Sequence, residues 1–311
     1  MRHPQRQPQQ GLPEAVTVYE VAPRDGLQNE QTIVPTDVKV EFIRRLVDAG
    51  LPAIEVTSFV RPDRVPQLAD AGEVLAAVGG RGGPAMPVLV PNRRGLDRAA
   101  EAGVRSIAIF GSATETFARK NLNRGLYEQF EMFEPTVAGA RDAGMDVRAY
   151  VSMCFGDPWE GDVPIDQVVG VGRRLFDLGA SQLSIGDSIG VATPGHVKEL
   201  LTAFEAAGLG ADSLAVHFHD TYGQALSNAY AALEAGVRTF DASAGGLGGC
   251  PFAPGATGNL ATEDLVWMLD GLGIRTGVDL AALVETSRWM GETIGRSVES
   301  RTVRALTSAS A

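Results

Sequence analysis

The 311-residue sequence has little cysteine and no long apolar stretch. Two cysteines are too few for a disulfide scaffold. No apolar run approaches the roughly 18 residues of a membrane span, and residues 1–13 lack the hydrophobic centre of a secretory signal. We interpret residues 1–13 as a disordered leader, with a very short mitochondrial presequence as the alternative, and we expect a cytoplasmic protein.

Positive charge is also scarce. The 27 Lys and Arg residues face 38 Asp and Glu residues, which gives a formal net charge of −11 with histidine neutral. Surfaces that bind nucleic acid or membranes present a basic face, so we expect neither kind of partner. An anionic ligand would therefore have to meet its positive charge locally.

Short β-rich runs, each followed by a segment of helical period, recur eight times along the chain. The strands are expected at Val16–Val21, Ala53–Ser58, Met86–Pro91, Ser106–Phe110, Val147–Met153, Gln182–Asp187, Leu214–His219 and Thr239–Ser243. This alternation is typical of a parallel sheet with crossover helices. Eight units in about 255 residues match a (β/α)8 TIM barrel. A doubly wound open sheet is the alternative.

The predicted barrel occupies residues 14–278, and residues 279–311 form a C-terminal helical extension. That extension contains a helix at about Leu280–Ile294. The pattern leaves open whether this helix caps the barrel or packs on a second copy in a homodimer.

Polar residues gather where the predicted strands end, which is where TIM barrels carry their active sites. The residues that share this position are Arg24, Asp25, Glu55, Ser58, Asp187, His217 and His219, with the glycine-rich loop around Cys250 after the last strand. This convergence predicts one site at the carboxyl end of the barrel.

Two histidines are separated by one residue on the seventh predicted strand. Side chains two apart on a strand share a face, so His217 and His219 can hold one ion together with Asp25. Such a set of nitrogen and oxygen ligands suits Mg²⁺ or Mn²⁺, whereas a closed zinc site would contain more thiolates. The alternative is a pair of ordinary polar side chains.

Three further residues are candidate site residues, and the first two each allow two interpretations. Glu55 lies on an apolar strand, where a carboxylate is costly unless it is close to a metal or paired, for example with Arg24. Asp187 either joins the site or caps the turn that follows it. Cys250 lies in a loop that we expect to be mobile and able to bring a thiol to a substrate, whereas Cys154 follows an apolar strand and is expected to be a small buried residue.

The blocks that contain these residues resemble the hydroxymethylglutaryl-CoA lyases. These enzymes belong to a metal-dependent barrel group that also contains isopropylmalate, citramalate and homocitrate synthases. The resemblance covers about Val16 to Val278 and is carried by RDGLQNE at 24–30, EVTSFV at 55–60, GDSIG at 186–190, VHFHDTYGQ at 216–224, and the loop 245–259 followed by LATED.

The resemblance implies a set of roles. It places a divalent metal on Asp25, His217, His219 and Asn259, and it includes His217 among the catalytic residues. Arg24 would stabilise an enolate, and Cys250 would take part in proton transfer. The surrounding catalytic shell would contain Glu55, Asp187 and Glu263.

The implied reaction is metal-dependent cleavage of an acyl-CoA, 3-hydroxy-3-methylglutaryl-CoA, to acetoacetate and acetyl-CoA, as in leucine degradation. The alternatives are a lyase for a longer 3-alkyl substrate, a condensing synthase of the same group, and a scaffold protein without activity. The sequence departs from the family pattern at Gln31, where many members have lysine. Loss of this cation weakens a direct carry-over of the family's contacts with the coenzyme A phosphates. Arg119 and Lys120, expected in the loop after the fourth strand, are candidate substitutes.

Overall fold

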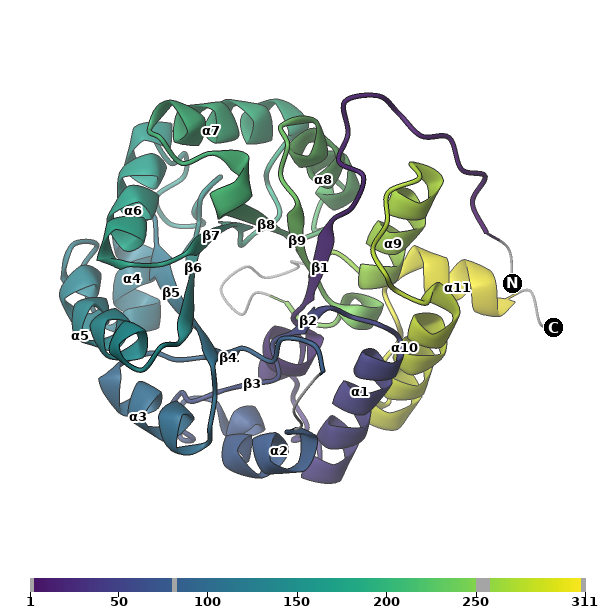
Figure 1. Ribbon diagram of the computed structural model, residues 1–311, viewed down its shortest axis with the longest axis horizontal. Coiled ribbons are helices and arrows are strands. Elements are labelled where there is room, and N and C mark those ends of the chain that lie inside the picture. The colour runs from purple at the N-terminus through teal and green to yellow at the C-terminus, as the bar shows by residue number, and fades with distance from the viewer. Residues whose placement is uncertain (1–2, 80–82, 250–257, 309–311) are drawn as a thin grey trace.

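The computed structural model describes residues 3–79, 83–249 and 258–308. Its strands form one parallel sheet that curls into a ring with helices on the outside (Figure 1). The strand order is β2-β1-β9-β8-β7-β6-β5-β4-β3. The strands are β1 Thr17–Glu20, β2 Ala53–Ile54, β3 Thr57–Ser58, β4 Val88–Leu89, β5 Ser106–Ser112, β6 Asp146–Ser152, β7 Gln182–Asp187, β8 Leu214–Phe218 and β9 Thr239–Ala242.

The ring closes through β2 and β3, which are two parts of one strand interrupted at Glu55. The Glu55 amide donates to the Glu20 carbonyl at 2.8 Å, and the next amide, of Val56, donates to the Pro87 carbonyl on the other side at 3.1 Å. The structure is therefore a closed barrel of eight strands, and the predicted TIM-barrel fold is confirmed.

The expected strands are found, and the largest difference in length is at β4. It was predicted over Met86–Pro91 but spans only Val88–Leu89. Pro87 and Pro91 have no amide hydrogen to donate to a neighbouring strand, which explains the short ladder.

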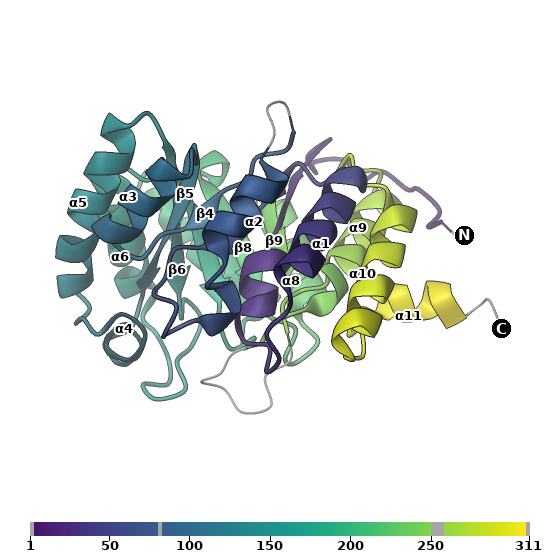
Figure 2. The same cartoon turned by 90° about the horizontal axis from the view of Figure 1, so that it is seen from below.

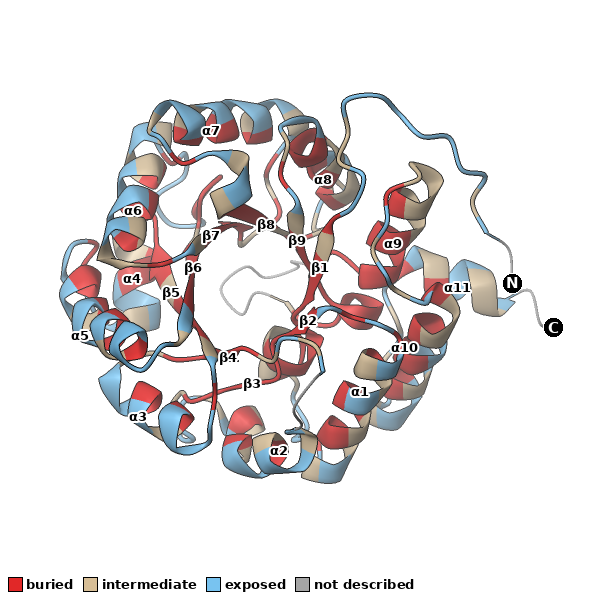
Figure 3. Cartoon of the chain, in the orientation of Figure 1, coloured by how far each residue is buried: buried red, intermediate tan, exposed pale blue. Residues whose placement is uncertain are grey.

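Helices cover the outside of the ring. They are α1 Thr36–Asp48, α2 Ala71–Val78, α3 Arg93–Glu101, α4 Glu115–Leu122, α5 Glu128–Asp142, α6 Ile165–Leu178, α7 Pro194–Ala206, α8 Ala225–Glu234, α9 Thr262–Gly271, α10 Leu280–Ile294 and α11 Arg301–Thr307. On α6 the buried residues include Val168, Val171 and Leu175, spaced by three and four as an amphipathic helix requires. Figure 3 shows the same division around the ring, with buried residues toward the sheet and exposed ones outside.

One expected loop is a helix. Arg119 and Lys120, predicted in a loop after the fourth strand, belong to α4. Arg119 pairs with Glu115 one turn earlier at 2.5 Å, and the Lys120 ammonium lies 4.9 Å from the Trp159 ring centre. Local charge pairing and stacking therefore engage both cations.

The C-terminal extension contains the expected helix α10 and a shorter helix, α11. Both lie on the side of the barrel where α1 and α9 are found (Figures 1 and 2). Residues 3–13 contain no helix or strand, and the Gln7 amide donates to the Gly271 carbonyl at 2.8 Å. Within the described residues, no helix has the length and apolar character needed to cross a membrane.

Candidate active site and metal centre

Three predicted ligands meet at the carboxyl end of the barrel. Each of Asp25, His217 and His219 offers one possible ligand atom, and these three atoms lie within 4.8 Å of one another. The two imidazoles come from the end of β8, with ring centres 5.4 Å apart. Asp25 comes from a one-turn π-helix, Ala22–Gly26, in which its amide and that of Arg24 both donate to the Val21 carbonyl. This tight turn directly follows β1 and brings Asp25 to β8.

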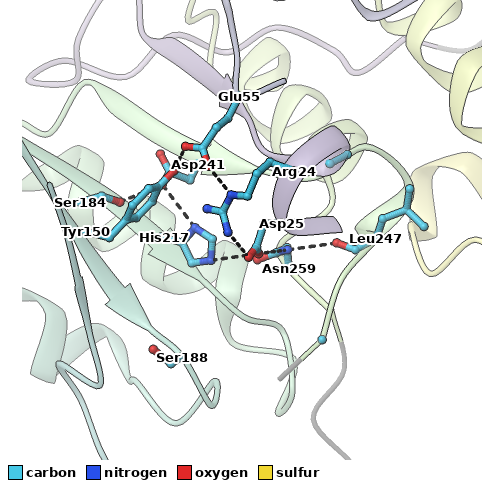
Figure 4. Close-up of polar contacts among 12 residues, drawn as sticks. Arg24, Asp25, Glu55, Tyr150, Ser184, Ser188, His217, Asp241, Leu247 and Asn259 are labelled. Carbon is cyan, nitrogen blue, oxygen red and sulfur yellow. Dashed lines mark hydrogen bonds and ion pairs between the residues drawn. The ribbon is translucent and has the colours of Figure 1, made fainter. Parts of the chain in front are cut away.

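Asn259 completes the set that the resemblance implied. Its Nδ2 donates to Asp25 Oδ2 at 2.9 Å and to the Leu247 carbonyl at 3.0 Å (Figure 4). Among the described residues, Asn259 Oδ1 and His219 Nδ1 are buried polar atoms without a hydrogen-bond partner. Leaving such atoms unpaired is costly. The two unpaired atoms and the chemistry of the donors therefore fit a divalent cation.

The protonation states also suit a metal site. Burial alone would raise the pKa of Asp25, but Arg24 and the two histidines lower it to about 2. Burial and the neighbouring His217 lower the pKa of His219 to about 4. At neutral pH the carboxylate is ionised and His219 is neutral, which are the forms that bind metal.

Arg24 and Glu55 form a buried ion pair beside this cluster. Arg24 Nε donates to Glu55 Oε1, and Arg24 Nη1 donates to Asp25 Oδ1 at 2.7 Å. Two tyrosines hold the other oxygen of Glu55, with hydroxyl distances of 3.1 Å for Tyr19 and 2.6 Å for Tyr150. The pairing that the sequence offered for Glu55 is therefore present, and it fixes the guanidinium next to Asp25.

Asp187 and Glu263 hold loops in place. Asp187 accepts hydrogen bonds from the amides of Val191 and Ala192 at 2.9 and 3.0 Å, which is the turn-capping alternative, and burial raises its pKa to about 6. Glu263 accepts from the Gly245 amide and the Ser287 hydroxyl, and burial raises its pKa to about 8. Both carboxylates are buried and their hydrogen bonds go to loop amides and a hydroxyl, while the charge of His217 also acts on Asp187.

The structure describes one of the two cysteines, Cys154. Cys154 is fully buried, as predicted, and its thiol lies 3.0 Å from the Val151 carbonyl. Burial raises the pKa of that thiol well above its usual range. Cys250 lies outside the described residues, so its role stays a prediction.

The sequence interpretation missed a second layer of polar residues inside the barrel. Asp241 on β9 accepts a hydrogen bond from Ser184 and contacts His217 (Figure 4). It also accepts a hydrogen bond from Arg148. Glu20, at the end of β1, accepts from the Ala22 and Ala244 amides and so holds the loops after β1 and β9. Glu20 is a polar residue in the predicted strand Val16–Val21, which is otherwise mostly apolar, so it carries the same signal that drew attention to Glu55, whereas Asp241 lies in a strand of mixed polarity.

The C-terminal extension contacts the loops of the barrel mouth. Arg301 donates to Asp220, the residue after His219, at 2.7 Å, and the Glu299 amide donates to the Gly245 carbonyl at 3.0 Å. Asp264 at the start of α9 accepts from the Ser300 hydroxyl at 2.8 Å. The extension is thus joined to the loops after β8 and β9.

The fold and the cluster together define a (β/α)8 barrel with a metal-type site at the carboxyl ends of its strands. Comparison with known proteins makes this more specific. The HMGL-like family model matches residues 15–290, and the chain belongs to that family. The predicted family resemblance is confirmed.

Individual relatives agree with this assignment. The chain is 49% identical over 294 residues to the mitochondrial hydroxymethylglutaryl-CoA lyase of Rattus norvegicus, covering 94% of this chain and 90% of the relative. The hydroxymethylglutaryl-CoA lyase structure from Pseudomonas aeruginosa superposes with a TM-score of 0.94 at 44% identity, covering 96% of this chain and 100% of that one. A lyase from Acinetobacter baumannii, solved with coenzyme A and 3-methylmalate, gives a TM-score of 0.90 at 36% identity, covering 96% and 97%.

Proposed function

We propose that this chain is a hydroxymethylglutaryl-CoA lyase that cleaves 3-hydroxy-3-methylglutaryl-CoA to acetoacetate and acetyl-CoA. The observation that carries the proposal is the joining of a metal-type ligand cluster, Asp25 with His217 and His219, to a buried arginine in a chain of this family. A metal held by the ligand cluster would bind oxygen atoms of the substrate, and the arginine would stabilise an oxyanion.

The proposed ligands are Asp25, His217, His219 and the amide oxygen of Asn259, with Mg²⁺ or Mn²⁺ as the ion. A divalent cation there would polarise and orient the substrate's tertiary hydroxyl and carboxylate oxygens. The chain contributes a rigid support for this set. Asp25 is held by Arg24 and Asn259, and Asn259 is held in turn by the Leu247 carbonyl.

Arg24 is the proposed stabiliser of the enolate oxygen that develops on the acetyl-CoA fragment. Arg24 is buried, with only 6% of the residue exposed, and two carboxylates fix its guanidinium before any substrate arrives. A fixed cation that cannot lose its proton needs no reorganisation during the reaction. Glu55 holds that cation in position and is itself held by hydrogen bonds from the Tyr19 and Tyr150 hydroxyls.

Cys250 is the proposed acid that returns a proton to the enolate carbon. This assignment rests on the family resemblance of the glycine-rich loop. Two glycines on either side of Cys250 in that loop accept hydrogen bonds. Asn29 Nδ2 donates to the Gly249 carbonyl at 3.0 Å, and the Asp220 amide donates to the Gly258 carbonyl at 3.2 Å.

A direct test uses purified, metal-loaded protein and a panel of acyl-CoA substrates. We expect release of acetyl-CoA and acetoacetate from 3-hydroxy-3-methylglutaryl-CoA without any second substrate. Asp25→Asn should be inactive. Asp70→Asn, which changes an aspartate just before α2 that pairs with Lys39 of α1, should match the parent. Preferred cleavage of a longer 3-alkyl analogue would change the substrate. Condensation of an acyl-CoA with a keto acid, without cleavage, would overturn the proposal in favour of a synthase.

A further inference from the structure

Behind the ligand cluster, one buried carboxylate contacts a proposed metal ligand from the side away from the cluster. His217 and Asp241 are paired residues on the neighbouring strands β8 and β9. His217 Nδ1 lies 3.3 Å from Asp241 Oδ2, and His217 Nε2 lies 4.0 Å from Asp25 Oδ2. The imidazole therefore spans the distance between two carboxylates and presents a different nitrogen to each.

Asp241 is itself held on two further sides. Arg148 on β6 donates to its Oδ1 at 2.5 Å, and Ser184 on β7 donates to its Oδ2 at 2.8 Å. Only 2% of Asp241 is exposed. The Arg148 guanidinium also lies 3.9 Å from the ring centre of Tyr19, which restricts its movement. The carboxylate is consequently fixed from three strands and cannot turn away from His217.

This arrangement dictates which nitrogen of His217 carries hydrogen. An ionised carboxylate only accepts hydrogen bonds, so a neutral imidazole facing Asp241 must place its hydrogen on Nδ1. Nε2 then keeps its lone pair on the side of Asp25. A metal-binding histidine needs this combination, since the nitrogen toward the metal must be unprotonated while the other donates to a partner.

We propose that Asp241 is a positioning residue that fixes the tautomer and the ring orientation of His217, so that Nε2 is ready to bind the metal. The proposal rests on the metal site proposed above and goes beyond the ligand set. Outer-shell partners of this kind typically contribute about 10- to 100-fold to metal affinity. Arg148 and Ser184 act through Asp241 by fixing its carboxylate.

The variant Asp241→Asn tests the proposal with little change in volume. The permanently charged Arg148 needs an acceptor, so the amide oxygen of asparagine should turn toward it. The amide nitrogen would then face His217 and donate to Nδ1. This reverses the tautomer and puts the ring hydrogen on Nε2, where it blocks the metal.

The first measurement reads the tautomer in metal-free protein. Long-range ¹H–¹⁵N spectra at pH 9 resolve the ring nitrogens of the four histidines, and His217→Gln assigns the relevant signals. We expect the Nδ1–H form of His217 in the parent and the Nε2–H form in Asp241→Asn. A parent His217 in the Nε2–H form would overturn the proposal, even if the variant does not fold.

The second measurement is Mn²⁺ affinity, read from the electron paramagnetic resonance signal of free Mn²⁺. Asp241→Asn should bind about 10- to 100-fold more weakly than the parent. Asp70→Asn should bind as the parent does, because its ion pair with Lys39 lies between α1 and the segment before α2. Unchanged affinity in a folded Asp241→Asn would overturn the proposal. Neither measurement uses a substrate, so failure of the lyase assignment would leave both results interpretable.

Discussion

Replacing Arg24 by lysine separates the charge of this residue from its shape. The guanidinium uses two different nitrogens, Nε toward Glu55 and Nη1 toward Asp25. A lysine ammonium has one nitrogen on a flexible chain and cannot reproduce two directed bonds on separate atoms. Arg24→Lys should therefore keep the positive charge but lose the fixed geometry.

The structure sets the size of the expected effects. Loss of one preorganised stabiliser of a developing oxyanion typically lowers kcat by about 10²–10³-fold, or about 3–4 kcal/mol. The buried charge contributes separately to stability. Removal of one partner of a buried ion pair costs about 3–5 kcal/mol, so Arg24→Gln should lower Tm clearly and Arg24→Lys much less.

The assay compares kcat, KM and Tm in the parent, Arg24→Lys and Arg24→Gln. Arg173→Lys serves as the control, because Arg173 makes an exposed pair with Asp177 on the outer face of α6. We expect both Arg24 variants to lose kcat by at least about 10²-fold with little change in KM, whereas only the glutamine variant loses much stability. A change confined to KM would mean that Arg24 only binds substrate, and parent-like turnover in Arg24→Lys would refute the argument from shape.

Three further predictions address the metal, the thiol and pH. His219→Ala should abolish Mn²⁺ binding and most activity with the fold intact, and chelator-treated parent should recover with Mg²⁺ or Mn²⁺; full activity without metal would contradict this. A thiol reagent should inactivate the enzyme at Cys250 and spare the buried Cys154, and Cys250→Ser should bind Mn²⁺ normally but lose most turnover, whereas a parent-like rate would make the thiol a bystander. Folding raises the pKa of Glu263 from its ordinary value of 4.5 to about 8. Between these two pH values the folded state keeps the Glu263 proton, whereas the unfolded state has released it. Stability should thus fall as pH rises from about 4.5 to about 8, by at most about 1.4 kcal/mol per pH unit, and urea midpoints should show a shallower fall in Glu263→Gln; parallel curves for parent and variant would refute it.

Much of the barrel could be predicted because its signals are local. Strand β7 begins and ends at the predicted residues, and so does helix α10. Each has a clear hydrophobic period and a recognisable end, such as the Asp279 side chain that accepts from two amides at the start of α10. The elements that carry a regular pattern through a whole turn or strand are the ones that a sequence reveals.

Helices α4 and α11 could not be predicted in this way because contacts from elsewhere stabilise them. In the first turn of α4, the Thr116 amide donates to the carboxylate of Glu160, a residue of the loop after β6. The start of α11 is anchored by Asp264 of α9, which accepts from the Thr302 amide at 2.7 Å and from the Ser300 hydroxyl. Both helices span eight residues or fewer, so local propensity alone is weak.

The same reasoning explains why the metal ligands were found and Asp241 was not. His217 and His219 are two residues apart, so their shared face is visible in the sequence. Asp241 acquires its role from Arg148, which lies 93 positions earlier in the chain. A lone aspartate on a short strand could equally face solvent, and only the closed barrel brings the two residues together.

Charge balance connects this second layer to the proposed chemistry. Within the network described above, the carboxylates of Asp25, Glu55 and Asp241 face the guanidiniums of Arg24 and Arg148, which leaves one net negative charge when both imidazoles are in the neutral form that binds metal. A divalent cation bound at the proposed metal site would change that balance to one net positive charge.

The protein as a whole carries a formal net charge of −11, so its overall charge repels an anionic acyl-CoA. Attraction for the substrate's carboxylate must therefore come from the site itself, and in this arrangement it depends on the metal. Removing the metal should consequently weaken substrate binding as well as turnover, which equilibrium binding of a non-cleavable acyl-CoA analogue with and without Mg²⁺ would measure; equal affinity in both conditions would refute the electrostatic argument.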